Sequence, residues 1–193
     1  GGYLDQQVNH TRVAAHCEGK RVLDCFTFQG GFALHAAKAG ASEVLGLDQS
    51  DGAVTQARMN ATSNHLEASF ESANVFDWLK KNSGKEPRAF DVVILDPPSF
   101  TRNRASVPDA LRGYKEIHLR ALRLLSPGGM LATFCCSHHV DDDLFLDTIL
   151  SAAADARRVL RLKETYRQSP DHPIIPAIRE TEYLKGFLLE VLP

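Results

Sequence analysis

Two cysteines stand side by side in TFCCSHHV, residues 133–140, and two histidines follow one residue later. Cys135, Cys136, His138 and His139 are residue types that can pack in a core, bind a metal ion or supply a nucleophilic thiol. Adjacent residues of a strand point to opposite faces, so the two thiols are poorly placed to share one metal ion. The sequence also has no Cys-x-x-Cys pair. We therefore expect no metal site, and at most one thiol that does chemistry.

A second group of residues predicts a cofactor site. Asp24 is followed by the turn CFTFQGGF, in which Gly30 and Gly31 open a helical stretch. Asp48 ends the next apolar run, where a carboxylate can accept hydrogen bonds from ribose hydroxyls. The turn lacks Lys, Arg and the Gly-x-Gly-x-x-Gly pattern, so a ligand with a pyrophosphate group is not expected. S-adenosylmethionine, a ribose-bearing ligand without phosphates, fits better; the alternative is a generic turn with a surface Asp.

A third signal follows the buried run FDVVIL. Asp96 is succeeded by Pro97 and Pro98, which stiffen the chain where it leaves the sheet. A carboxylate held there can hydrogen-bond a planar heterocycle, and Asp/Asn-Pro-Pro after a strand is typical of methyltransferases that act on amino groups or nucleobases. The alternative is an ordinary turn Asp. Three such signals in order on successive strands favour the functional interpretation.

Short β-rich runs alternate with amphipathic helical stretches, and this alternation positions all three signals. It predicts a mostly parallel sheet with helices on both faces, so the fold class is α/β. The expected strands are 22–25, 43–47, 70–71, 90–95, 130–135, 159–165 and 184–192. The expected helices are 3–16, 31–39, 51–64, 76–81, 110–125 and 141–154, and the least regular stretches are 99–109 and 168–181.

Composition sets further limits. The 193 residues are 44% hydrophobic and 24% charged, with a net charge of −2, which argues against broad, charge-driven nucleic-acid binding but leaves room for a local basic face. No apolar run reaches the roughly 18 residues of a membrane span, and no signal peptide is visible. The four cysteines do not form a secreted disulfide pattern, so we expect a reducing, cytoplasmic setting. The start at Gly1 is typical of a piece of a longer protein.

Across nearly its whole length the sequence resembles the class I bacterial 23S rRNA (cytosine-C5) methyltransferase I family, whose members usually carry an N-terminal PUA domain. The matching stretches are GGYLDQQVNH, VLDCFTFQGGFALHAA, EVLGLDQS, FDVVILDPPSF, TFCCSHHV, DHPI and EYLKGFLLEV. The resemblance implies a Rossmann-like, S-adenosylmethionine-dependent fold with a seven-stranded sheet and a reversed last strand. It further implies that residues 1–193 are one methyltransferase domain without the PUA domain, that the partner is rRNA, and that no membrane or metal is involved; whether the protein forms a homodimer stays open.

The resemblance also assigns roles to individual residues. Cys136 matches the nucleophile, which would add to C6 of cytosine so that C5 becomes nucleophilic, and Asp96 would hold the base and stabilise charge on its ring. The cofactor would contact Asp24, Phe26, Gly30, Gly31, Asp48, Gln49, Asn74, Val75, Asp77 and Asp96. The target nucleotide would contact Pro97, Pro98, Ser99 and Phe100, and His172 would either line the base pocket or serve in a turn; Arg102 and Arg104 are added by the charge pattern described below.

The sequence departs from the family pattern at two places. The front motif reads Asp-Gln-Gln-Val-Asn-His at residues 5–10, where the family commonly has Asp-Gln-Arg-x-Asn-Arg. Ser99 stands where many RNA 5-methylcytosine enzymes of other subfamilies have a second cysteine. The group that removes the C5 proton therefore stays open.

A basic face for RNA is predicted after Asp96. Residues 101–123 contain six basic side chains against two acidic ones, and Arg102 and Arg104 in the irregular part are the best candidates; a solvated helix face is the alternative for the others. Lys185 could reach the active site, although a surface strand lysine is the default expectation.

Two other function classes stay open. A methyltransferase acting on a guanine nitrogen or an exocyclic amine needs no thiol, so an inert Cys136 would favour it. A degenerate cofactor- or RNA-binding module would not bind S-adenosylmethionine. The sequence does not identify the nucleotide, or whether the substrate is naked rRNA or an assembled subunit.

Overall fold

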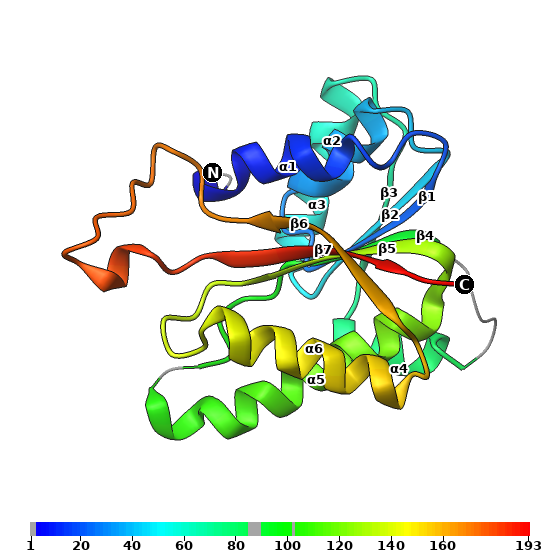
Figure 1. Ribbon diagram of the computed structural model, residues 1–193. Coiled ribbons are helices and arrows are strands. Elements are labelled where there is room, and N and C mark those ends of the chain that lie inside the picture. The colour runs from blue at the N-terminus through cyan, green and yellow to red at the C-terminus, as the bar shows by residue number, and fades with distance from the viewer. Residues whose placement is uncertain (1–2, 85–89, 102) are drawn as a thin grey trace.

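The computed structural model describes residues 3–84, 90–101 and 103–193 (Figure 1). Its centre is a seven-stranded sheet in the order β3-β2-β1-β4-β5-β7-β6. The strands are β1 Arg21–Cys25, β2 Glu43–Asp48, β3 Ser69–Ser72, β4 Phe90–Leu95, β5 Leu125–Cys135, β6 Leu160–Tyr166 and β7 Lys185–Val191. All neighbouring strands pair in parallel except β7, which runs antiparallel to β5 and to β6. The predicted fold class and reversed last strand are thus confirmed.

Helices cover both faces of this sheet (Figure 1). Their hydrophobic residues divide into two buried clusters, one with α1, α2 and α3 and the other with α4, α5 and α6. The helices are α1 Gln7–Ala14, α2 Gly31–Lys38, α3 Asp51–Ser63, α4 Val75–Asn82, α5 Val107–Leu124 and α6 Asp142–Asp155, with short 3-10 turns η1 Leu4–Gln6, η2 Arg104–Ser106 and η3 Arg179–Thr181.

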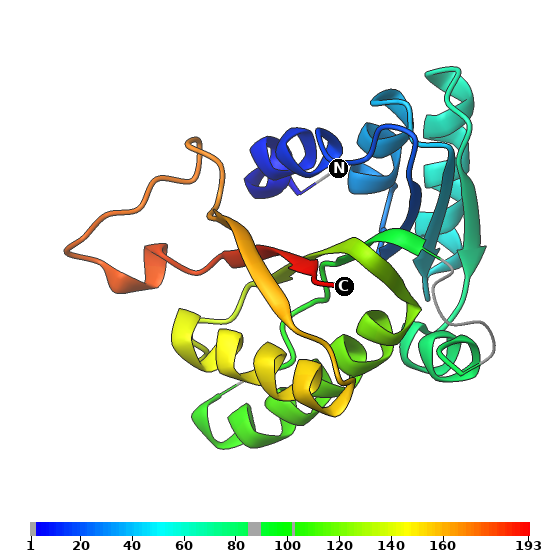
Figure 2. The same cartoon turned by 45° about the vertical axis from the view of Figure 1, so that its right-hand side comes forward.

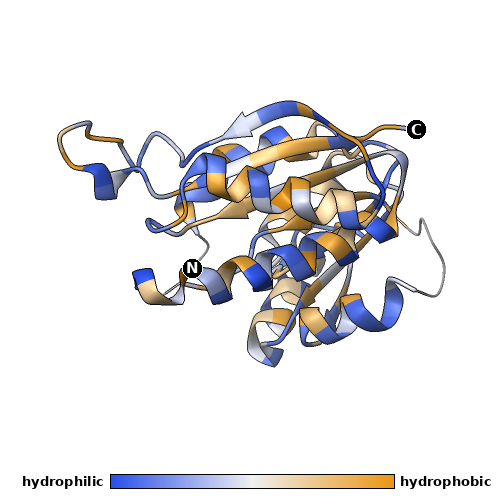
Figure 3. Cartoon of the chain, turned by 60° about the horizontal axis from the view of Figure 1, so that its bottom comes forward, coloured by the Kyte–Doolittle hydropathy of each residue, from blue (hydrophilic) through white to orange (hydrophobic). Residues whose placement is uncertain are grey.

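The hydropathy of each element explains this layering. β4 is buried at five of its six positions, as a strand covered on both faces must be. Figure 3 shows largely hydrophobic central strands beneath helices that alternate hydrophobic and hydrophilic residues. None of the helices in the described residues has both the length and the apolar character of a membrane-spanning segment.

The boundary between α5 and β5 differs from the sequence expectation. The strand was expected from residue 130, but pairing begins at Leu125, opposite Phe90, and the register then shifts before Val92 pairs with Met130. Gly128 adopts a φ of 76° in this irregular stretch, a left-handed conformation that glycine adopts without steric cost. The Pro-Gly-Gly sequence at residues 127–129 therefore follows the end of the helix and lies inside β5. It makes the pairing with β4 irregular there and does not move the start of the strand to residue 130.

Residues 167–184, between β6 and β7, form an arm that extends away from the sheet (Figures 1 and 2). The N-terminal segment holds the arm at its base. The Ser169 N–H donates to the Asp5 carbonyl at 2.7 Å, and the Val8 N–H donates to Ser169 Oγ at 3.1 Å. The first residues of the chain and the arm therefore meet beside the carboxyl ends of the central strands.

Candidate active site

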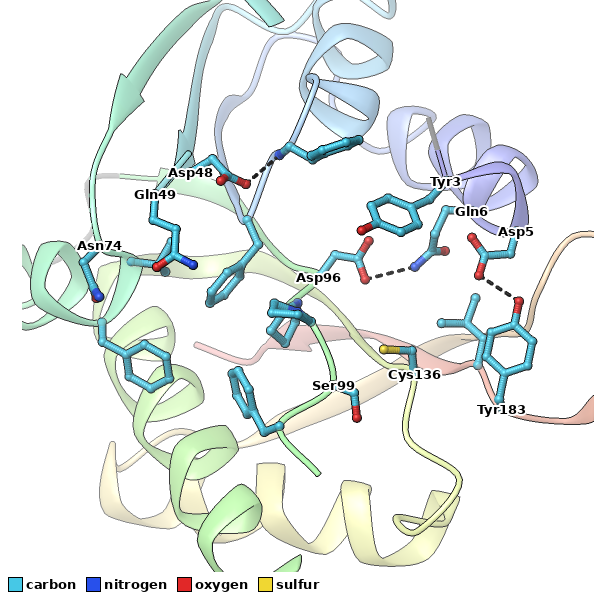
Figure 4. Close-up of a pocket in the computed structure, with 18 residues that line it drawn as sticks. Tyr3, Asp5, Gln6, Asp48, Gln49, Asn74, Asp96, Ser99, Cys136 and Tyr183 are labelled. Carbon is cyan, nitrogen blue, oxygen red and sulfur yellow. Dashed lines mark hydrogen bonds between the residues drawn. The ribbon is translucent and has the colours of Figure 1, made fainter. Parts of the chain in front are cut away.

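The largest concentration of the predicted residues lies at the carboxyl ends of β1, β2, β4 and β5. The chain order reverses between β1 and β4, and open α/β sheets bind ligands in the crevice beside such a point. A cavity of about 570 Å³ opens there (Figure 4). It is lined by Tyr3, Asp5, Gln6, Phe26, Phe28, Asp48, Gln49, Asn74, Val75, Phe76, Asp96, Pro97, Pro98, Ser99, Phe100, Cys136, Tyr183 and Leu184.

Asp48, the last residue of β2, is fixed at one end of this cavity. Its Oδ2 accepts from the Phe28 N–H at 2.9 Å, and its Oδ1 accepts from the Ser50 N–H at 2.9 Å. Each carboxylate oxygen has a second lone pair, so the group can still accept hydrogen bonds from a ligand. A carboxylate aimed in this way suits the two hydroxyls of a ribose.

The turn after β1 holds two residues in an uncommon backbone conformation. Phe26 has φ 65° and Phe28 has φ 50°, and both line the cavity. A bulky residue persists there only when its surroundings fix it. Thr27, between them, donates from its N–H to the Leu47 carbonyl at 2.8 Å and from Oγ1 to Asp24 Oδ2 at 2.6 Å. The turn is therefore prearranged, with both aromatic residues at the cavity.

Asp24, Gly30 and Gly31 support this turn from behind, and none of them lines the cavity. Asp24 is fully buried, accepts from the Ala33 N–H at 3.0 Å, and has a pKa raised to about 7, chiefly by burial. Gly30 has φ 89°, and a Cβ on Gly31 would lie 2.7 Å from Nε2 of His10. The backbone conformation of Gly30 and the packing of Gly31 against α1 thus give both positions a structural reason to be glycine.

The N-terminus of α4 forms another part of the cavity wall. Asn74 caps the helix by accepting from the Asp77 N–H at 3.2 Å, and Asn74 and Val75 both line the cavity. The Asp77 side chain is exposed in the first turn and does not line it. Phe76, which the sequence analysis did not select, lines the cavity and lies against Phe100 with ring centroids 5.7 Å apart.

Asp96 lies near the middle of the cavity, directly after β4 (Figure 4). Its Oδ1 accepts from Gln6 Nε2 at 3.1 Å. Burial, followed by the charge of Asp24, raises the pKa of Asp96 to about 7, although the hydrogen bond from Gln6 opposes this shift. Asp96 can therefore exist as either a carboxylate or a neutral acid near neutral pH.

A chain of amide hydrogen bonds orients Gln6. Asn9, fully buried on α1, donates from Nδ2 to Gln6 Oε1 at 2.7 Å and to the Arg167 carbonyl at 2.9 Å. Because Oε1 accepts from Asn9, the Gln6 amide nitrogen is turned toward Asp96. The front motif thus connects the base of the arm to Asp96, a role that its sequence alone did not reveal.

Cys136, directly after β5, lines the cavity and is half-buried, whereas its neighbour Cys135 is fully buried. Cys135 Sγ donates to the Tyr114 hydroxyl at 3.3 Å on the opposite side of the sheet. The thiols are therefore on separate faces. Burial, then the charge of Asp96, raises the pKa of Cys136 to about 11.

Lys185 is not a surface residue, so the default expectation is wrong and the alternative, a lysine close to the active site, is the one that fits. Its side chain is buried, with 4% of the residue exposed. The ammonium group donates to the Ser137 carbonyl at 2.7 Å and to the Tyr183 carbonyl at 3.0 Å. Burial lowers the pKa of Lys185. The reversed strand β7 thus brings a cation under the turn that carries Cys136.

The residues predicted to contact a target nucleotide divide into two groups. Pro97, Pro98, Ser99 and Phe100 line the cavity. Arg104 is exposed in η2 outside it, and His172 is on the arm, with its Nδ1 3.2 Å from Asp171 Oδ1. Arg102 lies outside the described residues.

The predicted basic face is partly neutralised by ion pairs. Arg112 pairs with Asp109, Lys115 with Asp155 at 2.8 Å, and Arg120 with Glu116 at 2.8 Å. These acids are on the same helix or on α6, which packs against it. The solvated-face interpretation therefore fits α5, and Arg104 is the better candidate for contact with a polyanion.

Fold and site together define a class I methyltransferase. A family model for S-adenosylmethionine-dependent methyltransferases matches residues 1–188, and the chain belongs to that family. Its cofactor is S-adenosylmethionine, and the cavity fits it: Asp48 can accept ribose hydroxyls, while Phe26, Val75 and Phe76 offer apolar walls for the adenine ring.

The more specific relatives are methyltransferases of the large ribosomal subunit RNA. The chain is 41% identical to ribosomal RNA large subunit methyltransferase I of Erwinia tasmaniensis, covering 100% of this chain and 49% of the relative. It is 43% identical to the Aeromonas hydrophila protein of the same name, and that match covers 98% of this chain and 48% of the relative. The chain thus spans about half the length of the curated relatives it matches. Among solved structures, a methyltransferase complexed with SAH superposes with a TM-score of 0.86 at 23% identity, covering 98% of this chain and 50% of that one, which shows the shared fold.

Proposed function

We propose that the protein methylates C5 of a cytosine in large-subunit rRNA through a covalent adduct on Cys136, and that residues 1–193 act as one methyltransferase domain. The observation that carries this proposal is the convergence of Cys136 and Asp96 on the cavity that also contains Asp48. The names of the relatives support rRNA as the substrate.

The chemistry of cytosine explains why a thiol is needed. C5 is a weak nucleophile, and bound S-adenosylmethionine supplies an electrophilic methyl group. When the Cys136 sulfur bonds to C6, electron density moves to C5 and makes it nucleophilic. Asp96 takes the thiol proton and, as a neutral acid, donates a hydrogen bond to N3 of the ring. A carboxyl group with a pKa near 7 suits both roles.

The target base can enter the cavity only when it is not stacked between its neighbours in the RNA. Pro97, Pro98 and Phe100 form an apolar wall beside Asp96, which suits the flat faces of a pyrimidine. Base-modifying enzymes act on single-stranded or extruded nucleotides for this reason. The substrate is therefore expected to be a loop or an extruded cytosine of the rRNA.

One observation favours a second candidate, methylation of an exocyclic or ring nitrogen. The pKa of Cys136 is raised rather than lowered, so the free protein holds a thiol and not a thiolate. A nitrogen target needs no sulfur nucleophile, and the Asp-Pro-Pro turn could serve it unchanged. Only the covalent reaction requires Cys136.

Substitution of each thiol separates the two candidates. Cys136→Ala should reduce methyl incorporation into large-subunit rRNA by at least about 10³-fold, while calorimetry shows unchanged S-adenosylmethionine binding. Cys135→Ala is the matched control, and it should retain activity with a modest loss of stability. Full activity in Cys136→Ala would support the nitrogen target.

A further inference from the structure

In the proposed reaction a proton must leave C5 after the methyl group has arrived. Ser99, at the position of a second cysteine in other subfamilies, is unsuited to accept it. Its hydroxyl donates to the Thr101 carbonyl at 3.1 Å, and a neutral hydroxyl is a weak base. Asp96 already accepts from Gln6 and is assigned to the thiol proton and N3. The base is therefore another group in the cavity or water, and a group held in place there would accept the proton more efficiently than water.

Asp5 is such a group, and a short hydrogen-bond network holds it in place. Its Oδ2 accepts from the Tyr183 hydroxyl at 2.8 Å, and both side chains line the cavity. Its backbone carbonyl accepts from Ser169 at 2.7 Å, which anchors η1 on the arm. Within residues 3–84, 90–101 and 103–193, Oδ1 of Asp5 accepts no hydrogen bond, so this oxygen has lone pairs available to a proton donor.

The position of Asp5 matches the stereochemistry of the reaction. Figure 4 shows Asp48, Gln49 and Asn74 at one end of the cavity, and Asp5 and Tyr183 at the other end beside Cys136. A methyl group that arrives from the cofactor end adds to the ring face opposite the thiol. The hydrogen already on C5 then turns toward the thiol's face, so the base must lie on the Cys136 side.

We propose that Asp5 accepts the C5 proton, with Tyr183 as the residue that positions its carboxylate; this inference rests on the proposed function. The C5–H bond breaks and its proton bonds to Asp5 Oδ1. The electron pair of that bond forms the C5=C6 double bond, and the C6–S bond breaks with its pair leaving on the Cys136 sulfur. The leaving sulfur takes back the proton held by Asp96, and Asp5 releases the C5 proton to water.

The test separates methyl addition from proton loss. An rRNA transcript with tritium at cytosine C5 is incubated with the protein and methyl-labelled S-adenosylmethionine, and three quantities are followed: methyl label in RNA, tritium in water, and RNA–protein adduct that survives denaturation. In Asp5→Asn the first turnover should still add methyl, whereas tritium release falls about 100-fold and a methylated adduct accumulates. Glu180→Gln removes an exposed carboxylate on the arm that η1 contacts; it is the matched control and should behave as wild type.

Tyr183→Phe removes only the hydroxyl and keeps the inference testable if Asp5→Asn fails to fold. Its tritium release should lag methyl addition by about tenfold, the effect of one hydrogen bond to a charged group. The assignment would be overturned if, in each variant, tritium were released at the same rate as methyl is added. It would also be overturned if methyl addition were lost and no adduct formed. If wild type forms no adduct on a 5-fluorocytosine transcript, which cannot lose its C5 substituent as a proton, the proposed function fails instead.

Discussion

At the scale of single residues, burial decides the charge states at the site. Asp24 is fully buried, and its Oδ1 has no hydrogen bond within the described residues. Its pKa is raised to about 7 because ionisation there is opposed by desolvation. A carboxyl group whose pKa is higher in the folded than in the unfolded protein stabilises the fold while it is protonated. Its contribution is present below about pH 4 and is lost as pH rises toward 7.

Asp24→Asn should therefore change how stability depends on pH. The amide keeps an acceptor for Thr27 and Ala33, and removes the buried charge. We expect the variant's free energy of unfolding to exceed that of wild type by up to about 4 kcal/mol at pH 8, and by much less at pH 5. Urea unfolding of the ligand-free proteins at both pH values measures this, and parallel pH dependences would contradict it.

At the scale of elements, the reversed strand β7 contributes directly to the site. Its first residue, Lys185, hydrogen-bonds the carbonyl of Ser137 next to Cys136 and that of Tyr183 next to the arm. The succession of strands and helices along the chain could be predicted from the alternation of apolar runs. The sequence left Lys185 open between a surface position and one near the active site, because its direction depends on how the arm returns to the sheet, and no local pattern encodes that.

Lys185→Met should displace the segment around Cys136 and Ser137 without weakening cofactor binding. The substitution retains the aliphatic stem but loses two hydrogen bonds from a buried cation. We expect kcat for methyl transfer to fall about 10- to 100-fold, with the Kd for S-adenosylmethionine within about twofold of wild type. Lys163→Met, on exposed β6, is the matched control. A change in cofactor affinity with kcat intact would argue against this role.

At the scale of the whole molecule, the sequence predicted the fold and the three carboxyl-edge positions Asp48, Asp96 and Cys136 well, since each follows a recognisable strand. It missed seven residues of the cavity wall, which are Tyr3, Asp5, Gln6, Phe28, Phe76, Tyr183 and Leu184. These residues come from the N-terminal segment, the turn after β1, the first turn of α4 and the arm, whose relative positions depend on long-range contacts. It left the charged side chains of α5 open between an RNA-binding face and a solvated face, because the pairing of Lys115 with Asp155 on a separate helix is not visible in the sequence.

The contribution of exposed arginines to RNA binding can be tested by substituting them one at a time. Arg104→Ala should weaken binding of an rRNA transcript about two- to fivefold and reduce the slope of log K against log salt by about 1. Arg112→Ala, whose guanidinium is paired with Asp109, should have little effect. Filter binding between about 50 and 200 mM salt measures both variants. Equal losses in both would contradict the distinction drawn from the ion pairs.

The covalent adduct is the central claim, and its site can be located directly. Wild-type protein is incubated with S-adenosylmethionine and a large-subunit rRNA transcript containing 5-fluorocytosine, then denatured, digested and fragmented by mass spectrometry. The account predicts a methylated fluorocytosine nucleotide bonded to Cys136, with Cys135 unmodified in the same peptide. Efficient methylation of the natural transcript without any adduct on Cys136, or an adduct on another residue, would contradict it.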